Sequence, residues 1–137
     1  MPDVSVKRVL VVDDHAPTRA LVRAILEAEK NIRYETVEAA DAKSCLMAVE
    51  TKGPFDLILL DVGLPDLDGY SVCAAIRRVD THVPIVFVTA KGELKDYRAG
   101  REAGADSYLV KPIARSALRS LVGLFTTVER AKPKKQP

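Results

Sequence analysis

Cysteine and long hydrophobic runs are scarce in this sequence of 137 residues. No apolar run approaches the about 20 residues that a membrane helix needs, and the first residues lack the apolar core of a signal peptide. The two cysteines, Cys45 and Cys73, lie far apart on predicted helix faces. We therefore expect a cytoplasmic chain without a membrane segment, in which both thiols are small buried groups and not a disulfide.

An excess of one charge is also missing. The chain has 21 Lys and Arg against 19 Asp and Glu, and the net charge of +2 is largely due to Lys132, Lys134 and Lys135. No basic stripe with interleaved aromatic residues is present, so we expect no direct contact with nucleic acid. The length fits one folded domain, placed at residues 1–130, and residues 131–137 are expected to be a disordered basic tail or the start of a linker.

Apolar runs and amphipathic stretches alternate five times along the chain. They predict strands at 8–12, 34–38, 56–60, 84–89 and 106–110, and helices at 17–29, 41–52, 68–79, 93–103 and 114–129. Short connections between alternating elements indicate a parallel sheet with right-handed crossovers and helices on both faces. The second strand alternates polar and apolar residues and is expected at an edge, whereas the other four are mostly apolar and are expected inside.

Polar side chains stand at the carboxyl ends of four predicted strands. Asp13 and Asp14 follow the first strand, Asp61 follows the third, Thr89 closes the fourth and Lys111 follows the fifth. These ends meet at one edge of a parallel sheet, where open α/β sheets bind their ligands. Two charges about 5 Å apart repel by roughly 3 kcal/mol at an effective dielectric of about 20. Three carboxylates therefore need protonation, Lys111 or a cation for relief.

The chemistry of such a carboxylate cluster can be narrowed further. Oxygen ligands with few neutral donors suit a hard divalent ion, and we expect Mg²⁺. This ion keeps several waters and takes phosphate oxygens, which points to phosphoryl chemistry. A carboxylate beside Mg²⁺ and an ammonium group can act as a nucleophile and form an aspartyl phosphate. Asp61 is the candidate nucleophile.

Five ordered motifs carry a resemblance to a known family. They are Asp13-Asp14, then Asp61 with Pro65 and Asp68-Gly69, then Thr89-Ala90, Gly104-Ala105-Asp106-Ser107-Tyr108 and Lys111-Pro112. Together they resemble the receiver domain of two-component response regulators, over residues 7–128. The resemblance implies an α/β, flavodoxin-like, doubly wound fold with five helices and a five-stranded parallel sheet in the order 2-1-3-4-5.

The resemblance also implies roles for the site residues. Asp61 is expected to be the phosphoacceptor, with Asp14 as the main metal ligand and Asp13 as its partner, partly through water. The carbonyl of Gly63 is expected to complete the protein's share of the Mg²⁺ shell. Lys111 is expected to pair with Asp61 and then with the phosphoryl group, and its bond to Pro112 is expected to be cis.

Thr89 and Tyr108 resemble the family's switch pair, in which the hydroxyl moves toward the phosphoryl group and the ring follows inward. Tyr108 also has a simpler interpretation, as a strand aromatic packed on the sheet. Gly63 and Lys91 occupy the two positions that tune loss of the phosphoryl group in this family. Because neither orients an attacking water, slow self-dephosphorylation is expected.

Three other polar residues near the site have structural interpretations. Asp66 and Asp68 are expected to be a turn residue and a helix N-cap, not metal ligands. His15 follows the acid pair and is expected on the loop at the rim of the site, although it could also be read as a ligand or base.

The last two helices differ in how much apolar surface they offer. The fourth has few apolar residues, and Gly100 within it costs about 1 kcal/mol of helix propensity, so it is a candidate for movement. The fifth has more apolar residues than one sheet face requires, Leu124 and Val128 among them. An output face is therefore predicted on the fourth helix, fifth strand and fifth helix, for a partner or a phosphorylation-dependent homodimer.

The leading functional hypothesis is a signalling module that takes a phosphoryl group from a histidine kinase or phosphotransfer protein. It would catalyse only its own phosphorylation and dephosphorylation, without an external substrate. One alternative is a small Mg²⁺-dependent phosphohydrolase with an aspartyl intermediate, although Gly63 stands where a second, acid–base Asp would be needed. The other is a binding module that works without phosphorylation. Acetyl phosphate with Mg²⁺ separates the three through a stable adduct, steady phosphate release or neither.

Overall fold

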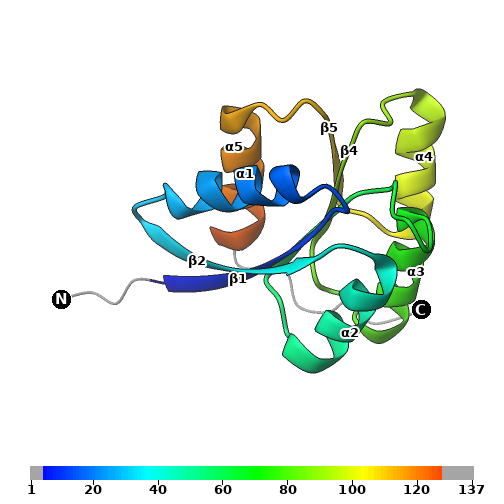
Figure 1. The fold of residues 1–137 in the computed structure, drawn as a ribbon, viewed down its shortest axis with the longest axis horizontal. Coiled ribbons are helices and arrows are strands. Elements are labelled where there is room, and N and C mark those ends of the chain that lie inside the picture. Colours follow the sequence, from blue (N-terminus) through cyan, green and yellow to red (C-terminus); the bar gives the residue numbers. More distant parts are fainter. Residues whose placement is uncertain (1–4, 128–137) are drawn as a thin grey trace.

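The computed structural model describes residues 5–127, and the predicted tail at 131–137 lies outside the described residues. Strands and helices alternate as predicted (Figure 1). The strands are β1 (Ser5–Val12), β2 (Ile32–Ala39), β3 (Leu57–Leu60), β4 (Ile85–Thr89) and β5 (Ser107–Val110). The helices are α1 (Ala16–Glu27), α2 (Ala42–Lys52), α3 (Gly69–Val79), α4 (Leu94–Ala103) and α5 (Arg115–Thr127).

All five strands join one parallel sheet in the order β2-β1-β3-β4-β5, which confirms the predicted topology. Helices α1 and α5 cover one face, and α2, α3 and α4 cover the other (Figure 1). Because successive strand residues point to opposite faces, Val9 and Val11 pack under α1 and α5, whereas Leu10 and Val12 pack toward α2 and α3. The central strands are therefore apolar where helices cover both faces, along all of β3, from Val9 to Val12 in β1 and from Ile85 to Val88 in β4.

The interior location that the apolar pattern predicted for β5 is wrong, whereas the strand order implied by the resemblance, which ends in the fifth strand, is confirmed. Among the described strands, β5 pairs only with β4 and forms the second edge of the sheet, and all four of its residues are only partly buried. Its apolar sequence suggested an interior strand because α4 and α5 cover its two faces. A strand is apolar when helices cover both of its faces. Its position at an edge affects only which backbone hydrogen bonds it can make with a neighbouring strand.

Capping residues set the ends of three helices. Asp41 caps α2 through a hydrogen bond from the Ser44 N–H at 2.7 Å, and Asp68 caps α3 through the Ser71 N–H at 3.0 Å. Gly104 ends α4 with φ of 107°, a left-handed conformation that glycine adopts without strain.

The sequence pattern predicts apolar stripes on α1 and α3 that include Leu21 and Val79, but both stripes are narrower in the structure. Leu21 of α1 is 42% exposed and Val79 of α3 is 78% exposed. Both helices bury their faces through other residues, with Val22, Ile25 and Leu26 in α1 and Val72, Cys73 and Ile76 in α3. Leu21 falls at the margin of its stripe, where 3.6 residues per turn carry it away from the sheet, whereas Val79 is the last residue of α3.

The contrast between the last two helices holds in the structure. In α4 only Gly100 is buried, and Leu94 and Tyr97 are exposed at 66% and 41%. Helix α5 buries Leu118 and Val122 but leaves Leu124 58% exposed. The other surplus residue of this prediction, Val128, lies outside the described residues.

The two cysteines are free and buried, one in α2 and one in α3, as expected. Burial raises the pKa of Cys45 to about 12 and that of Cys73 to about 11. Both thiols are therefore protonated core groups at neutral pH. Among the described residues, no helix is long and apolar enough to cross a membrane.

Candidate functional site

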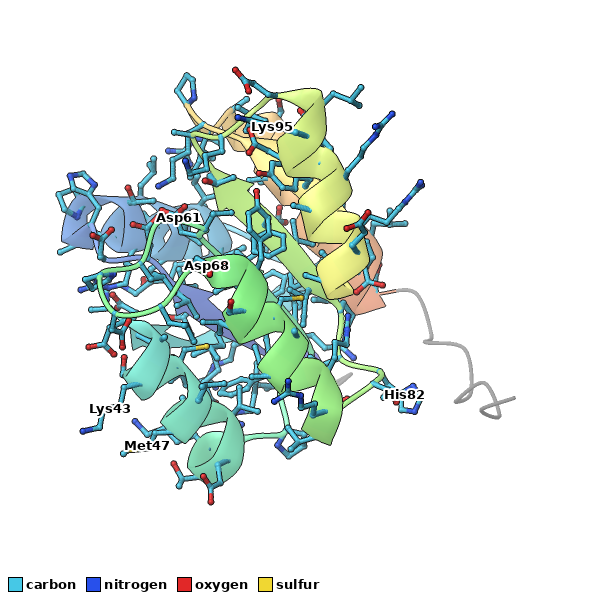
Figure 2. All side chains as sticks on the ribbon, turned by 90° about the vertical axis from the view of Figure 1, so that its right-hand side faces the viewer. Lys43, Met47, Asp61, Asp68, His82 and Lys95 are labelled. Carbon is cyan, nitrogen blue, oxygen red and sulfur yellow. The ribbon has the colours of Figure 1, made fainter. Side chains whose placement is uncertain are left out.

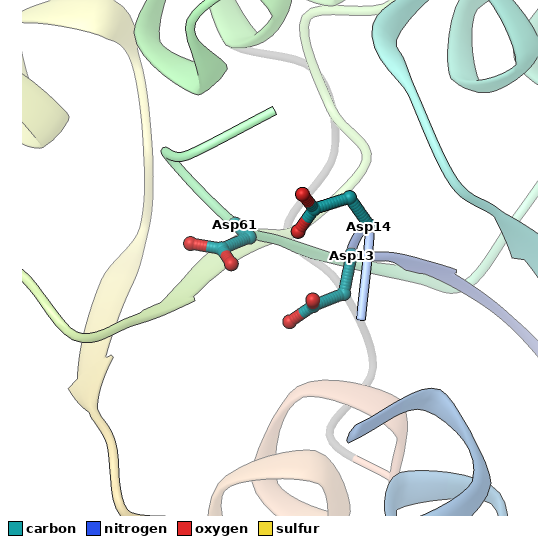
Figure 3. A group of neighbouring side chains, drawn as sticks. All are labelled: Asp13, Asp14 and Asp61. Carbon is teal, nitrogen blue, oxygen red and sulfur yellow. The ribbon is translucent and has the colours of Figure 1, made fainter. Parts of the chain in front are cut away.

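Three carboxylates meet where β1 and β3 end. The strand register pairs Val12 with Leu60, so the next residues, Asp13 and Asp61, stand side by side. Asp14 completes the group, and one oxygen of each carboxylate lies within 4.8 Å of the others (Figure 3). Asp13 and Asp61 are buried, with 3% and 7% of their surface exposed, whereas Asp14 is exposed. The predicted cluster is therefore formed, with one open side.

Lys111 supplies the positive charge of the site. Its backbone N–H donates to the Thr89 carbonyl at 2.7 Å, which sets it at the end of β5 beside β4. Its Nζ donates to Asp61 Oδ2 at 3.0 Å and to Asp13 Oδ2 at 2.7 Å. The contact with Asp61 was predicted, and the shorter one with Asp13 was not. The peptide bond between Lys111 and Pro112 is cis, as expected.

Electrostatics keep this pair charged. Burial alone would raise the pKa of Asp61. The Lys111 ammonium, the Thr89 hydroxyl and the Gly63 N–H outweigh burial, so this pKa is lowered below its ordinary value. Burial likewise would lower the pKa of Lys111, but its hydrogen bonds to Asp13 and Asp61 raise it. Asp61 is therefore a carboxylate at neutral pH, as a nucleophile must be.

Gly63 touches the site through its backbone. Its N–H donates to Asp61 Oδ1 at 3.2 Å, so the two oxygens of Asp61 have different partners. A Cβ built on Gly63 would meet nothing within 4 Å, and the site is open beside this residue. The predicted metal-ligand role of the Gly63 carbonyl stays a prediction.

Thr89 is buried at the end of β4, 2% exposed, and its Oγ accepts the Lys91 N–H at 3.4 Å. Tyr108 lies farther along the same side of the sheet, where its ring packs 5.7 Å from that of Phe87. Its hydroxyl lies 3.2 Å from the hydroxyl of Tyr70 on α3. The structure therefore places Tyr108 in a packed aromatic cluster, and the sequence pattern had not indicated Tyr70.

Asp66 and Asp68 each stabilise the first turn of a helix and lie outside the carboxylate cluster. Asp68 is the N-cap of α3, at the far end of the loop that begins with Asp61 (Figure 2). Asp66 is not confined to its own turn, because its carboxylate accepts the N–H groups of Ala42 at 2.7 Å and Lys43 at 3.0 Å. It therefore stabilises the first turn of α2 from another loop, and these bonds lower its pKa.

His15 lies at the rim of the site, as predicted. It is the N-cap of α1, and its ring Nδ1 lies 2.8 Å from the Thr18 hydroxyl, away from the carboxylates. Its backbone N–H donates to Asp13 Oδ1 at 2.9 Å. The backbone N–H of His15 thus orients the Asp13 carboxylate, whereas its ring contacts Thr18 of α1.

Arg19 is a site residue that the sequence pattern did not reveal. Its Nη1 donates to the backbone carbonyl of Asp13 at 2.6 Å, and its Nε pairs with Glu38 of β2 at 3.0 Å. The guanidinium thereby ties the loop bearing the acid pair to the neighbouring strand. An arginine one turn into an amphipathic helix has no sequence signal that identifies such a partner.

Comparisons with known proteins decide the family. The profile of the response regulator receiver domain matches residues 9–123. This chain belongs to the response regulator receiver domain family. A crystal structure of a CheY-like receiver domain protein from Methanospirillum hungatei superposes with a TM-score of 0.82 at 30% identity, covering 90% of this chain and 95% of that one. It confirms the flavodoxin-like fold of this receiver domain.

Curated relatives of the receiver domain are longer proteins. The probable transcriptional regulator ycf27 of Cyanophora paradoxa is 38% identical over 120 residues, which cover 88% of this chain and 48% of the relative. The transcriptional regulatory protein TcrA of Mycobacterium tuberculosis is 41% identical over 109 residues, which cover 80% of this chain and 42% of the relative. This chain therefore spans about half the length of these relatives.

Proposed function

We propose that this receiver domain accepts a phosphoryl group on Asp61, with a divalent cation bound beside it. The observation that carries the proposal is the position of the Asp61 carboxylate. It is buried, paired with Lys111 at 3.0 Å and grouped within 4.8 Å of two further carboxylates. Three acids this close are unfavourable unless positive charge joins them, and Lys111 supplies only one of the charges required.

The donor set suits Mg²⁺ as that cation. Asp13, Asp14 and Asp61 offer only oxygen ligands, which hard cations prefer, and the exposed Asp14 leaves an open side on which waters and phosphate oxygens fit. We propose the carbonyl of Gly63 as a further ligand. A bound Mg²⁺ would neutralise charge on the phosphoryl oxygens during transfer.

Asp61, Lys111 and Thr89 have different roles in the proposed phosphoryl transfer. An oxygen of the ionised Asp61 attacks the phosphorus, a new O–P bond forms, and the bond from phosphorus to the donor breaks with its electrons passing to the donor. The Lys111 ammonium lies beside Asp61 and Asp13, where it offsets the added negative charge. Thr89, buried at the neighbouring strand end, is positioned to donate its hydroxyl to the phosphoryl group.

A histidine kinase or phosphotransfer protein is the proposed donor. In this proposal the domain catalyses only its own phosphorylation and dephosphorylation and turns over no external substrate. We also propose a cytoplasmic location, which its free buried cysteines suit. We propose that Thr89 and Tyr108 transmit the phosphorylated state to a partner or a second copy. The proposed surface comprises α4, β5 and α5, where Leu94, Tyr97 and Leu124 are exposed. Regulation of transcription is named for relatives about twice as long, and it is not part of the function proposed for this domain.

Intact-mass measurement after incubation with acetyl phosphate and Mg²⁺ tests the proposal. We expect one stable phosphoryl adduct on the wild type and none on Asp61→Asn. Asp66→Asn serves as the control, because it changes an exposed acid that stabilises α2, outside the cluster, and should keep the adduct. An adduct on Asp61→Asn would contradict the assignment. Steady phosphate release without an adduct would favour a phosphohydrolase, and neither result would favour a phosphorylation-independent binding module.

A further inference from the structure

Four aromatic rings from four elements form a cluster between the sheet and α4. Tyr108 of β5 lies at the centre, with ring centroids 5.7 Å from Phe87 of β4 and 4.6 Å from Tyr97 of α4. Tyr70 of α3 packs edge-on against Phe87 at 5.3 Å. The ring of Tyr108 therefore contacts residues of both β4 and α4.

A chain of hydrogen bonds passes through the same cluster. The Tyr70 hydroxyl donates to the backbone carbonyl of Asp96, in the first turn of α4, at 3.3 Å. A phenol has one proton, so Tyr70 can only accept in its 3.2 Å contact with the Tyr108 hydroxyl. Tyr108 therefore donates to Tyr70, and Tyr70 donates to α4. Burial, followed by the hydrogen bond with Tyr70, raises the pKa of Tyr108, which keeps that donor protonated.

The hydrogen-bonded chain and the ring contact lie on the same face of α4. Asp96 and Gly100 are four residues apart, one above the other on the helix. A Cβ on Gly100 would lie 3.0 Å from Cδ2 of Tyr108 and 3.2 Å from Cδ2 of Phe87. The absence of a side chain at Gly100 thus lets α4 approach the Tyr108 ring closely, while Tyr70 holds the turn before it.

We propose that the Tyr70 hydroxyl is a latch for the switch. It joins Tyr108 to the first turn of α4 in the unphosphorylated domain, and it releases both when Tyr108 moves. This inference rests on the proposed function, in which phosphorylation of Asp61 displaces Tyr108. Both hydrogen bonds are long for O–H donors, which ordinarily lie about 2.5–3.0 Å from their acceptors, so a small displacement of the ring breaks them. Tyr70 is a positioning residue and takes no part in phosphoryl transfer.

The first test measures hydrogen exchange of the α4 amides in the unphosphorylated full chain. Tyr70→Phe deletes the hydroxyl and keeps the ring, and we expect α4 to exchange about two- to tenfold faster, as loss of hydrogen bonds of ordinary net strength implies. Tyr97→Phe is the matched control. It deletes a tyrosine hydroxyl from the same cluster, but that hydroxyl is not part of the Tyr108–Tyr70–Asp96 chain. Equal exchange in the two variants would overturn the latch.

The second test asks whether the two tyrosines share one hydrogen bond. Tyr108→Phe should speed exchange less than Tyr70→Phe, because it leaves the bond from Tyr70 to Asp96 in place. The double variant should exchange at the rate of Tyr70→Phe alone, since no further bond of the chain is lost. Effects that multiply in the double variant would mean that the hydroxyls act independently and would overturn the proposal.

The third test separates a latch from a merely stabilising contact. Beryllium fluoride with Mg²⁺, as a phosphoryl mimic, should change α4 exchange in the wild type and change it several-fold less in Tyr70→Phe, where the bonds are already absent. If beryllium fluoride changed the α4 exchange rate by the same factor in the wild type and in Tyr70→Phe, the inference would be overturned. Intact mass after acetyl phosphate treatment tests the proposed function separately. A wild type without an adduct would refute that function, and the exchange rates of the untreated variants would still decide the latch.

Discussion

Lys111 reaches Asp61 from the edge strand of the sheet and holds its carboxylate at 3.0 Å, although the two residues are 50 positions apart in the sequence. The same ammonium holds Asp13 at 2.7 Å. Lys111 therefore binds the ends of β1, β3 and β5 together and keeps the proposed nucleophile ionised.

This pairing predicts a dependence of stability on pH. The folded-state pKa of Asp61 is lowered, so its contribution is present above the unfolded value of about 3.9 and is lost as pH falls through the folded value. The folded-state pKa of Lys111 is raised, so its contribution is complete below about 10.4 and is lost as pH rises through the folded value. Carboxyl NMR titration without metal should place the Asp61 pKa below its ordinary value in the wild type and above it in Lys111→Met. An unchanged pKa in Lys111→Met would show that Lys111 does not control ionisation.

Removing Asp14 should weaken Mg²⁺ binding far more than removing His15. Asp14 is an exposed member of the carboxylate cluster, whereas the His15 ring is directed to Thr18. Asp14→Ala should also slow phosphorylation by acetyl phosphate, because a phosphoryl group of about −2 charge then approaches with less shielding. Mg²⁺ titrations can be followed by tyrosine emission, since the chain has four Tyr and no Trp. Similar losses in Asp14→Ala and His15→Ala would place His15 among the ligands.

Arg19→Ala should destabilise the fold by about 1.5–3 kcal/mol, the range for hydrogen bonds to charged groups, and weaken Mg²⁺ binding several-fold. The reason is its bond to the Asp13 carbonyl, which fixes the acid loop. Arg23→Ala is the control, because Arg23 pairs with the same Glu38 but does not contact Asp13, and its 46% exposed side chain predicts a loss below about 1 kcal/mol. Chemical denaturation and Mg²⁺ titration measure both variants. Identical Mg²⁺ affinities in the two would show that Arg19 does not position the loop.

Gly69→Ala should destabilise the domain by about 3 kcal/mol or more, because α3 begins against the end of β3. A Cβ on Gly69 would lie 2.2 Å from the backbone oxygen of Asp61, so the backbone itself must shift. Gly63→Ala, in the same loop, meets nothing within 4 Å and should change stability by less than about 0.5 kcal/mol. Urea denaturation compares the two. Equal stabilities would contradict the close approach of α3 to the site.

Much of the fold follows from local patterns in the sequence. The apolar runs specify which segments are strands, and the order of alternating elements implies parallel pairing. Asp41 and Asp68 indicate helix starts because a short acidic side chain satisfies the free N–H groups of a first turn. Acids that directly follow buried strands must meet at one sheet edge, so the cluster of Asp13, Asp14 and Asp61 was predictable.

Resemblance to the receiver family added what local patterns do not contain. The strand order and the roles of Thr89 and Lys111 came from that resemblance, because periodicity describes the faces of one element and not its neighbours. That order places β5 at an edge, whereas the apolar pattern alone suggests an interior strand, since residues covered by helices on two faces have the same composition at an edge as in the centre.

Contacts between side chains of different elements could not be predicted from local patterns. The bond from Lys111 to Asp13, the capping of α2 by Asp66 and the contact of Tyr70 with Tyr108 each join separate elements. Such contacts depend on distances of a few tenths of an ångström, set by how the helices pack on the sheet. The order of strands and acids along the chain places these residues at the reactive edge, and packing determines which of them touch.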